Sequence, residues 1–158
     1  VDDDYMSSVT IQNLLYEITR SFEEISKKEI ILKTDKFNKP FLIKRSPEVT
    51  YGIRNFVGNA VKFSKSKVDI NLESLDDNEI IIKIRDDGPG FPDDIYRLIG
   101  EPYISTKSKK LKSKSGLGLG TFIGKTLLER KKAFIDFQNI PGGGAEVQIM
   151  WKTSDIKV

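Results

Sequence analysis

The chain contains neither histidine nor cysteine. Without histidine it has no His-based metal site, no Ser-His-Asp hydrolytic triad, no imidazole acid–base catalyst and no phosphohistidine of its own. Without cysteine it has no disulfide framework, which favours a reducing cytoplasm as its location. No apolar run approaches the ~20 residues that a membrane-spanning helix needs. Neither a signal peptide nor a membrane anchor is visible in the sequence.

The remaining composition is that of a single folded domain. With 158 residues and 38% hydrophobic content, the chain is long enough to bury a core. Charged residues make up 31% of it, but the net charge is only +3, which argues against a general polyanion-binding protein. The basic character is local, because five lysines fall in one short stretch: Lys107, Lys109, Lys110, Lys112 and Lys114.

Hydrophobic periodicity predicts three helices and six strands in the order α, β, β, α, β, β, loop, α, β, β. Thr10 is a candidate cap for the first helix, Ser46-Pro47 has the chemistry of a second helix start, and the third runs from about Gly118 to Lys131. The expected strands are 30–34, 41–44, 68–72, 80–84, 134–137 and 146–151. This order predicts an α/β (α+β) two-layer sandwich, with helices on one face of a mixed sheet.

Two glycine runs are the most informative feature of the chain. Asp86-Asp87-Gly88-Pro89-Gly90 follows an apolar strand, and Gly116-Leu117-Gly118-Leu119-Gly120 leads into a helical pattern. Glycine lets the backbone approach a ligand closely, and a helix start presents free N–H groups to an anion. A carboxylate in one run and a basic loop between the two therefore suggest a nucleotide pocket.

In the first run, Asp86 ends the predicted strand, where its carboxylate can accept a hydrogen bond from an exocyclic amine such as that of adenine. Gly88 and Gly90 would let the base lie against bare backbone. The alternative is an ordinary Asp-Gly turn that closes a hairpin. An EF-hand calcium loop is excluded, because its alternating oxygen ligands and closing glutamate are missing.

The second run is not a dinucleotide-binding fingerprint, since that motif follows a strand directly and has another glycine spacing. The Gly-Lys-Ser/Thr of a Walker motif is also missing. A helix N-terminus that holds phosphates beneath a lysine-rich lid fits better, and 88–115 is long enough for such a loop. The alternatives are a solvated flexible loop, and nucleic-acid binding by the same lysines, which lack interleaved aromatic residues.

The second predicted helix carries a polar face formed by Asn55, Asn59 and Lys62. Asparagine costs a helix roughly 0.5 kcal/mol relative to alanine, so two asparagines in its middle suggest a polar function. An amide oxygen can coordinate Mg²⁺, and a lysine can meet a phosphate as a point charge. The alternative is a solvated face with incidental asparagines.

Taken in order, these segments resemble the ATP-binding catalytic domain of two-component sensor histidine kinases, in the wider family of gyrase B, Hsp90 and MutL. Residues 55–64 resemble the N box, 86–90 the G1 box, 115–120 the G2 box and 142–145 the final glycine segment, while 101–107 stand where the F box belongs. Residues 101–106 and the stretch from Gly116 are similar to RegB/PrrB-type redox-responsive kinases. The resemblance implies a Bergerat-type ATP-binding fold with a long ATP lid.

The same resemblance implies roles for individual residues. Asn59 would be the Mg²⁺ ligand, Asp86 would read adenine, and Asn55 and Lys62 would act beside the phosphates as catalytic residues. The other implied ATP-binding residues are Phe63, Gly88, Gly90, Thr106, Lys107, Gly116, Leu117, Gly118, Leu119 and Gly120. Two positions depart from the family pattern: Gly100 replaces a frequent F-box phenylalanine, and Phe63 a frequent tyrosine.

Asn55 also distinguishes between two reactions. Hydrolytic relatives such as gyrase B have a glutamate at this position to activate water, whereas an amide has no useful basicity at neutral pH. The resemblance therefore favours transfer of the γ-phosphoryl group to a partner over hydrolysis. The alternative is a nucleotide-gated binding module or an ATPase of the same superfamily.

For the longer protein, the resemblance implies a linker over 1–9, coming from an N-terminal dimerisation region, and the catalytic domain over 10–158. The expected partners are the histidine-bearing dimerisation domain of the same homodimeric protein and a downstream response regulator. We expect no nucleic acid and no membrane contact for this fragment, as the cytoplasmic domain of a membrane-bound sensor.

Overall fold

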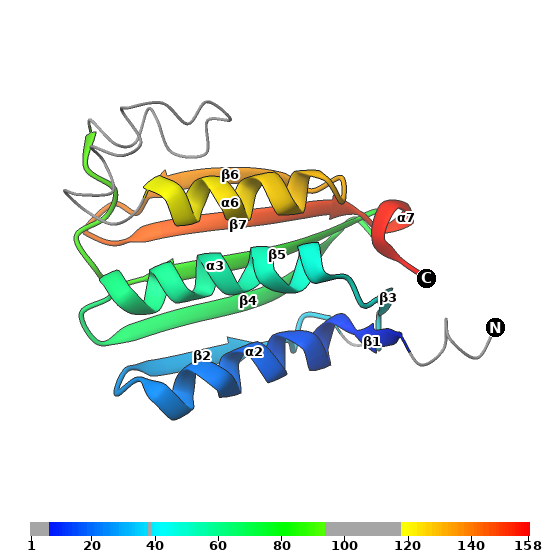
Figure 1. Ribbon diagram of the computed structural model, residues 1–158, viewed down its shortest axis with the longest axis horizontal. Coiled ribbons are helices and arrows are strands. Elements are labelled where there is room, and N and C mark those ends of the chain that lie inside the picture. Colours follow the sequence, from blue (N-terminus) through cyan, green and yellow to red (C-terminus); the bar gives the residue numbers. More distant parts are fainter. Residues whose placement is uncertain (1–6, 38, 94–117) are drawn as a thin grey trace.

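The computed structural model describes residues 7–37, 39–93 and 118–158 (Figure 1). Its helices are α2 (Ile11–Ile25), α3 (Pro47–Phe63), α6 (Gly118–Glu129) and α7 (Thr153–Ile156). Its strands are β1 (Ser8–Thr10), β2 (Glu29–Lys33), β3 (Leu42–Lys44), β4 (Lys67–Leu75), β5 (Glu79–Asp86), β6 (Phe134–Asn139) and β7 (Ala145–Lys152).

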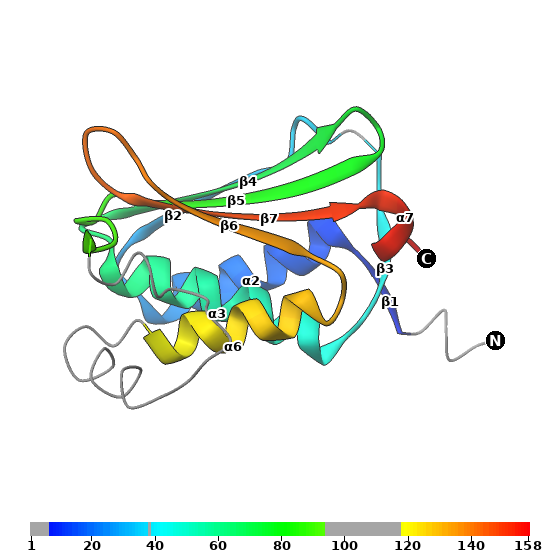
Figure 2. The same ribbon diagram turned by 90° about the horizontal axis from the view of Figure 1, so that it is seen from above.

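Five of the strands form one mixed sheet in the order β2-β4-β5-β7-β6. The β2–β4 pair is parallel, and the other neighbours in this sheet are antiparallel. Figure 2 shows α2, α3 and α6 together on one face of the sheet. The predicted α/β two-layer architecture, with a mixed sheet and helices on one face, is confirmed.

The first two predicted helices begin where their capping chemistry indicated. The Thr10 hydroxyl accepts a hydrogen bond from the backbone N–H of Asn13 at 3.1 Å. At α3, Ser46 is the N-cap and Pro47 occupies the first turn, where its missing N–H costs nothing. The buried hydrophobic side chains of α3 are those of Val49, Ile53, Phe56, Val57, Ala60 and Val61.

The C-terminus of α3 is stabilised from outside the helix. The ammonium group of Lys28, in the connection between α2 and β2, donates to the backbone carbonyls of Val61 at 2.8 Å and Ser64 at 2.6 Å. A cation at this end satisfies carbonyls that have no partner within the helix and complements the helix dipole. The end of α3 is thereby held in a defined position beside the turn that follows β5.

The structure differs from the sequence prediction at the N-terminal boundary. The sequence assigned Ser8 and Val9 to a linker, but both belong to β1, which pairs antiparallel with β3. Val9 is only 7% exposed. The folded unit therefore includes these two residues, because a strand partner lies more than thirty positions further along the chain, where local periodicity gives no sign of it.

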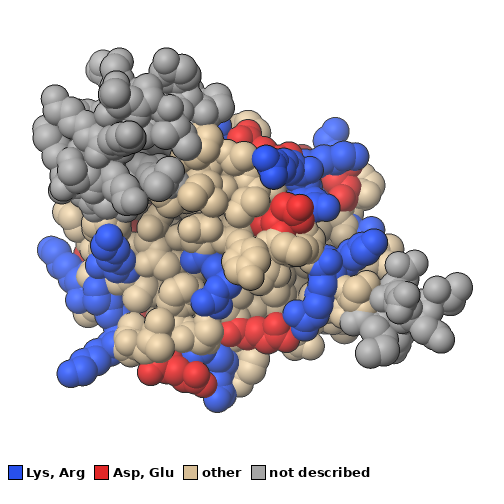
Figure 3. Space-filling view, viewed as in Figure 1, with Lys and Arg blue, Asp and Glu red and all other residues tan. Residues whose placement is uncertain are grey.

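Two smaller differences concern helices. Ile25 follows the apolar periodicity of the first predicted helix, which indicates a buried position, but it is 78% exposed at the end of α2. The short helix α7 was not predicted at all. Figure 3 shows acidic and basic side chains interspersed over the described part of one face of the molecule. Within the described ranges, no helix combines the length and the apolar composition needed to cross a bilayer.

Candidate functional site

One pocket brings together α3, the end of β5 with its following turn, and the first turn of α6. Its lining is mostly apolar and consists of Phe56, Asn59, Ala60, Phe63, Ile84, Asp86, Gly90, Phe91, Thr121, Phe137, Ala145 and Val147. The polar side chains are those of Asn59, Asp86 and Thr121. The structure thus places four of the predicted site residues, Asn59, Phe63, Asp86 and Gly90, in the same pocket.

Asp86 is half-buried at the C-terminal end of β5. Its Oδ1 accepts a hydrogen bond from the backbone N–H of Gly88 at 2.8 Å. Burial raises the pKa of the Asp86 carboxyl above its usual value, although backbone N–H groups of Gly88 and Ala145 oppose the shift. A carboxylate in such surroundings gains more than a solvated one from a further hydrogen-bond donor, as an exocyclic amine would supply.

The turn after β5 is packed tightly against the end of α3. A Cβ atom on Gly88 would lie 2.2 Å from the Phe63 carbonyl oxygen, a distance that no side chain can occupy. Gly90 has a φ of +83°, a conformation that favours glycine. Gly90 lines the pocket as predicted. The close approach of protein backbone accounts for the glycine at position 88, and its predicted contact with a base stays a prediction.

The asparagine face of α3 lies against the start of α6. The Asn59 amide nitrogen donates to the Thr121 hydroxyl at 3.2 Å. A Cβ on Gly120 would lie 3.6 Å from the amide atoms of Asn59 and 3.9 Å from Oδ1 of Asn55. The predicted face therefore meets the second glycine run. The sequence analysis missed Thr121, although a hydroxyl directly after Gly120 was an available signal.

Lys62 and Asn55 do not line the pocket. Lys62 is exposed, and its ammonium nitrogen lies 5.2 Å from the centre of the Phe63 ring. The Asn55 side chain donates to the Tyr51 carbonyl at 2.8 Å, one turn back along α3. Both residues lie on the same helix as Asn59 but outside the pocket lining. Their assignment to the phosphates stays a prediction.

Several predicted residues lie outside the described part of the chain. They are Thr106, Lys107, Gly116 and Leu117, together with most of the predicted lid. Gly118 and Leu119 are described only as the first positions of α6.

In the pocket, Asn59 offers an amide oxygen, rather than a carboxylate cluster, to a cation. Within the described ranges, no group of three or more His, Cys, Asp or Glu side chains could hold a metal ion. The Asn59 nitrogen is engaged by Thr121, which leaves the amide oxygen as the atom for a cation. This arrangement fits Mg²⁺, which takes few protein ligands and completes its shell with phosphate oxygens and waters.

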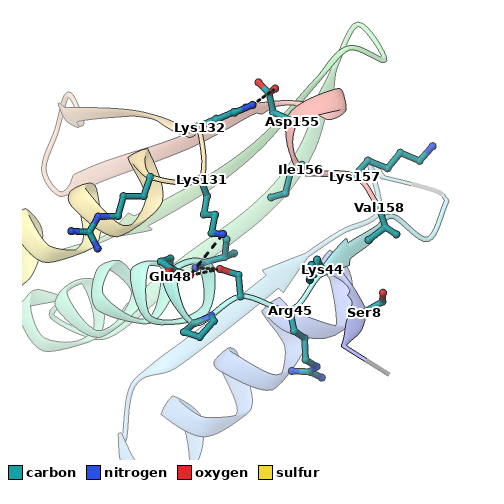
Figure 4. A pocket seen from close by; sticks show the side chains of 14 residues that line it. Ser8, Lys44, Arg45, Glu48, Lys131, Lys132, Asp155, Ile156, Lys157 and Val158 are labelled. Carbon is teal, nitrogen blue, oxygen red and sulfur yellow. Dashed lines mark hydrogen bonds and ion pairs between the residues drawn. The ribbon is translucent and has the colours of Figure 1, made fainter. Parts of the chain in front are cut away.

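A larger cavity of about 620 Å³ lies at the opposite end of α3, between its N-terminus, the end of α6 and α7 (Figure 4). Its lining is basic, with six Lys or Arg side chains against the two carboxylates of Glu48 and Asp155. Lys131 lies 4.0 Å from Glu48, and Lys132 lies 3.8 Å from Asp155. None of the predicted site residues lines this cavity. We therefore regard the smaller pocket at Asp86 as the candidate site.

Comparison with known proteins gives consistent results. The family described as "Histidine kinase-, DNA gyrase B-, and HSP90-like ATPase" matches residues 46–155. The sensor histidine kinase RegB of Cereibacter sphaeroides is 38% identical over 133 residues, which cover 74% of this chain and 29% of that protein. This chain therefore spans less than a third of the length of that relative. The predicted similarity to RegB-type kinases is confirmed.

Two solved structures share the fold. Full-length ShkA in complex with AMPPNP has a TM-score of 0.73 and 23% identity, over 95% of this chain and 31% of that one. Histidine kinase ThkA in complex with the response regulator protein TrrA has a TM-score of 0.70 and 18% identity, over 94% of this chain and 42% of that one.

Proposed function

The chain belongs to the histidine kinase-, DNA gyrase B- and HSP90-like ATPase family, and on this premise we propose that it is the ATP-binding catalytic domain of a two-component sensor histidine kinase. In this proposal it binds ATP with Mg²⁺ and transfers the γ-phosphoryl group to a histidine on a separate dimerisation domain. The observation that carries the proposal is the single pocket that contains both Asp86 and Asn59.

The pocket divides into two chemically distinct ends. At one end, Asp86 lies among apolar side chains, including Ile84 and Val147, which suits a purine ring with one exocyclic amine. At the other end, Asn59 and Thr121 lie beside Gly120, at the start of α6. There, backbone N–H groups and the helix dipole favour the negative charge of a phosphate chain.

The reaction requires placement more than acid–base chemistry from this domain. Bound Mg²⁺ would neutralise charge on the phosphate oxygens, with the Asn59 oxygen as its protein ligand. The bond between the γ-phosphorus and the ADP oxygen breaks as a bond to the acceptor imidazole nitrogen forms. The residues of this chain orient the nucleotide for that transfer.

The described lining supports transfer over hydrolysis. Asp86 is the one carboxylate among the described residues that line the pocket, and in this proposal it contacts the purine rather than the phosphates. Asn55 is an amide that donates to the Tyr51 carbonyl, so it is not a base for water activation. The acceptor histidine has to come from elsewhere, because this chain has none.

The proposal extends to the longer protein. The segment before β1 would connect this domain to a dimerisation region that carries the acceptor histidine, in a homodimeric sensor with this domain in the cytoplasm. A response regulator would then take the phosphoryl group. The solved complex of ThkA with a response regulator protein supports this partner by analogy of fold.

The proposal is tested by labelling with γ-³²P-ATP. The isolated chain should bind ATP in a calorimetric titration but should not phosphorylate itself on histidine. Adding a histidine-bearing dimerisation fragment should produce acid-labile label on that fragment. Strong ATP turnover without an acceptor would instead indicate an ATPase, and nucleotide binding without any transfer would indicate a nucleotide-gated binding module.

A further inference from the structure

The turn between Asp86 and Phe91 is held from the side of β6 by one side chain. The amide of Asn139, at the end of β6, accepts a hydrogen bond from the backbone N–H of Phe91 at 2.7 Å and donates one to the Phe91 carbonyl at 2.9 Å. These groups are 48 residues apart in sequence. A two-point contact of this kind fixes both the position and the orientation of the Phe91 peptide groups.

The same turn is held from the opposite side by Asp87. Its Oδ1 accepts hydrogen bonds from the backbone N–H groups of Lys65 at 2.8 Å and Lys67 at 3.2 Å, and its Oδ2 accepts from the Ser66 hydroxyl at 2.8 Å. Although burial acts to raise it, the pKa of Asp87 is well below its usual value, because these backbone N–H groups and the Ser66 hydroxyl stabilise the carboxylate. Asp87 thus ties the turn to the connection between α3 and β4.

Two residues of the pocket are direct neighbours of the attachment points in the sequence. Asp86 precedes Asp87 directly, and Gly90 precedes Phe91 directly, and both line the pocket. A Cβ on Gly90 would lie 2.8 Å from Oδ1 of Asn139, so the turn and this amide are in close contact. The path of the turn, and with it the direction of the Asp86 carboxylate, depends on both attachments.

We propose that Asp87 and Asn139 are positioning residues for nucleobase recognition, which hold the turn between them so that Asp86 presents its carboxylate to the exocyclic amine of adenine. This inference rests on the proposed function, because it takes ATP as the ligand. Neither side chain lines the pocket, and both act through Asp86 and Gly90. They would therefore control selectivity between purines more than affinity for the triphosphate.

A purely structural role makes a different prediction. If the two side chains only stabilised the fold, their removal would lower the fraction of folded protein and weaken the binding of every nucleotide by the same factor. If they position Asp86, removal weakens ATP, which has the 6-amino group, more than inosine triphosphate, which has a carbonyl oxygen there. The ratio of the two dissociation constants separates these cases, because the triphosphate contacts cancel.

The experiment measures dissociation constants for ATP and inosine triphosphate by calorimetry, on wild type, Asn139→Ala and Asp87→Ala. The temperature is kept below the unfolding midpoint of each variant. Asp87→Asn is the conservative partner of Asp87→Ala, since it keeps one of the two accepting oxygens. Gln138→Ala is the matched control, because Gln138 is an exposed neighbour on β6 that contacts Asp136 rather than the turn.

We expect wild type and Gln138→Ala to prefer ATP by about tenfold or more, as a hydrogen bond to a charged group is worth about 1.5–3 kcal/mol. Both alanine variants should lose most of this preference, and Asp87→Asn should recover part of it. An unchanged ratio in both alanine variants would overturn the positioning role while leaving ATP binding intact. A wild type that does not bind ATP, or does not prefer it, would instead overturn the proposed function.

Discussion

The side-chain amide of Asn59 donates a hydrogen bond to the hydroxyl of Thr121 at 3.2 Å, which joins α3 to α6 across 62 residues of sequence. The contact orients the amide, with its nitrogen toward α6. It also ties the asparagine face to the glycine-rich start of α6. The geometry of a metal site at Asn59 therefore depends on how these two helices pack.

Replacing Asn59 by alanine should abolish the effect of Mg²⁺ on ATP binding. In wild type we expect ATP to bind more tightly with Mg²⁺ than with EDTA. In Asn59→Ala the two titrations should agree within about twofold, because one protein oxygen ligand is lost. Asn71→Ala, on β4 and outside the pocket, is the matched control. A magnesium effect that survives in Asn59→Ala would show that the ion is held elsewhere.

Replacing Asp86 by asparagine should weaken ATP binding by about 10- to 100-fold, since a hydrogen bond to a charged acceptor is worth about 1.5–3 kcal/mol. The substitution preserves the shape of the side chain, so the loss reports on charge and on acceptor capacity. Calorimetric titration measures it. Asp136→Asn, on strand β6 of the same sheet, should bind ATP as wild type does. Equal affinity of Asp86→Asn and wild type for ATP would show that Asp86 does not bind the purine.

The pH dependence of ATP binding should reflect the raised pKa of Asp86. The ionised carboxylate accepts the hydrogen bond more strongly than the protonated acid does, so affinity should fall as the pH is lowered toward this pKa, at a higher pH than for an ordinary aspartate. ATP also takes up a proton on acidification. The Asp86→Asn variant shows the contribution of ATP protonation alone, because it lacks the carboxyl group but binds the same nucleotide. Parallel profiles for wild type and variant would contradict the assignment.

The raised pKa of Asp86 also makes the stability of the fold depend on pH. Because the folded state binds the Asp86 proton more tightly than the unfolded state, this group stabilises the fold only at low pH. Its contribution is lost as the pH rises from the ordinary aspartate value through the raised pKa of the folded protein. Asp86→Asn should therefore gain stability relative to wild type at neutral pH and lose that advantage in acid. Urea denaturation at several pH values measures the difference.

Gly88→Ala should destabilise the domain by about 1–3 kcal/mol, the usual cost of overpacking. The reason is that the new Cβ would lie 2.2 Å from the Phe63 carbonyl oxygen. Gly58→Ala, within α3, is the matched control. Its Cβ would lie 3.4 Å from the Phe22 ring, an ordinary contact. We expect that variant to be neutral or more stable by up to about 1 kcal/mol, because alanine favours a helix. Similar unfolding midpoints in the two variants would be inconsistent with the tight packing at Gly88.

Much of the fold was predictable because its signals are local. The caps at Thr10 and Ser46 act within three residues of the helices they begin. The alternation of buried and exposed residues in β4 follows from the two faces of a strand. Local signals could not reveal that β1 pairs with β3, or that Ile25 would be exposed at a helix end.

The residue types of the candidate site were predictable from the sequence. The side chains that hold the surrounding segments in place were not. Asp86 and Asn59 stood out because a carboxylate beside glycines and an asparagine within a helix are unusual. Asn139, Asp87 and Lys28 carry no such signal, since their partners are backbone groups from distant segments. Any asparagine, aspartate or lysine on a surface looks the same in sequence.

By itself, the sequence determined the order of helices and strands, the layered architecture and the identity of the polar groups available to a nucleotide. Those properties depend on neighbours within a few positions. Tertiary structure alone decided that Asp86 and Asn59 face one pocket, that burial raises the pKa of Asp86, and that Thr121 and Asn139 fix the surrounding segments. Each of these results from contacts between residues far apart in the chain, whose geometry exists only once the sheet and its helices have packed together.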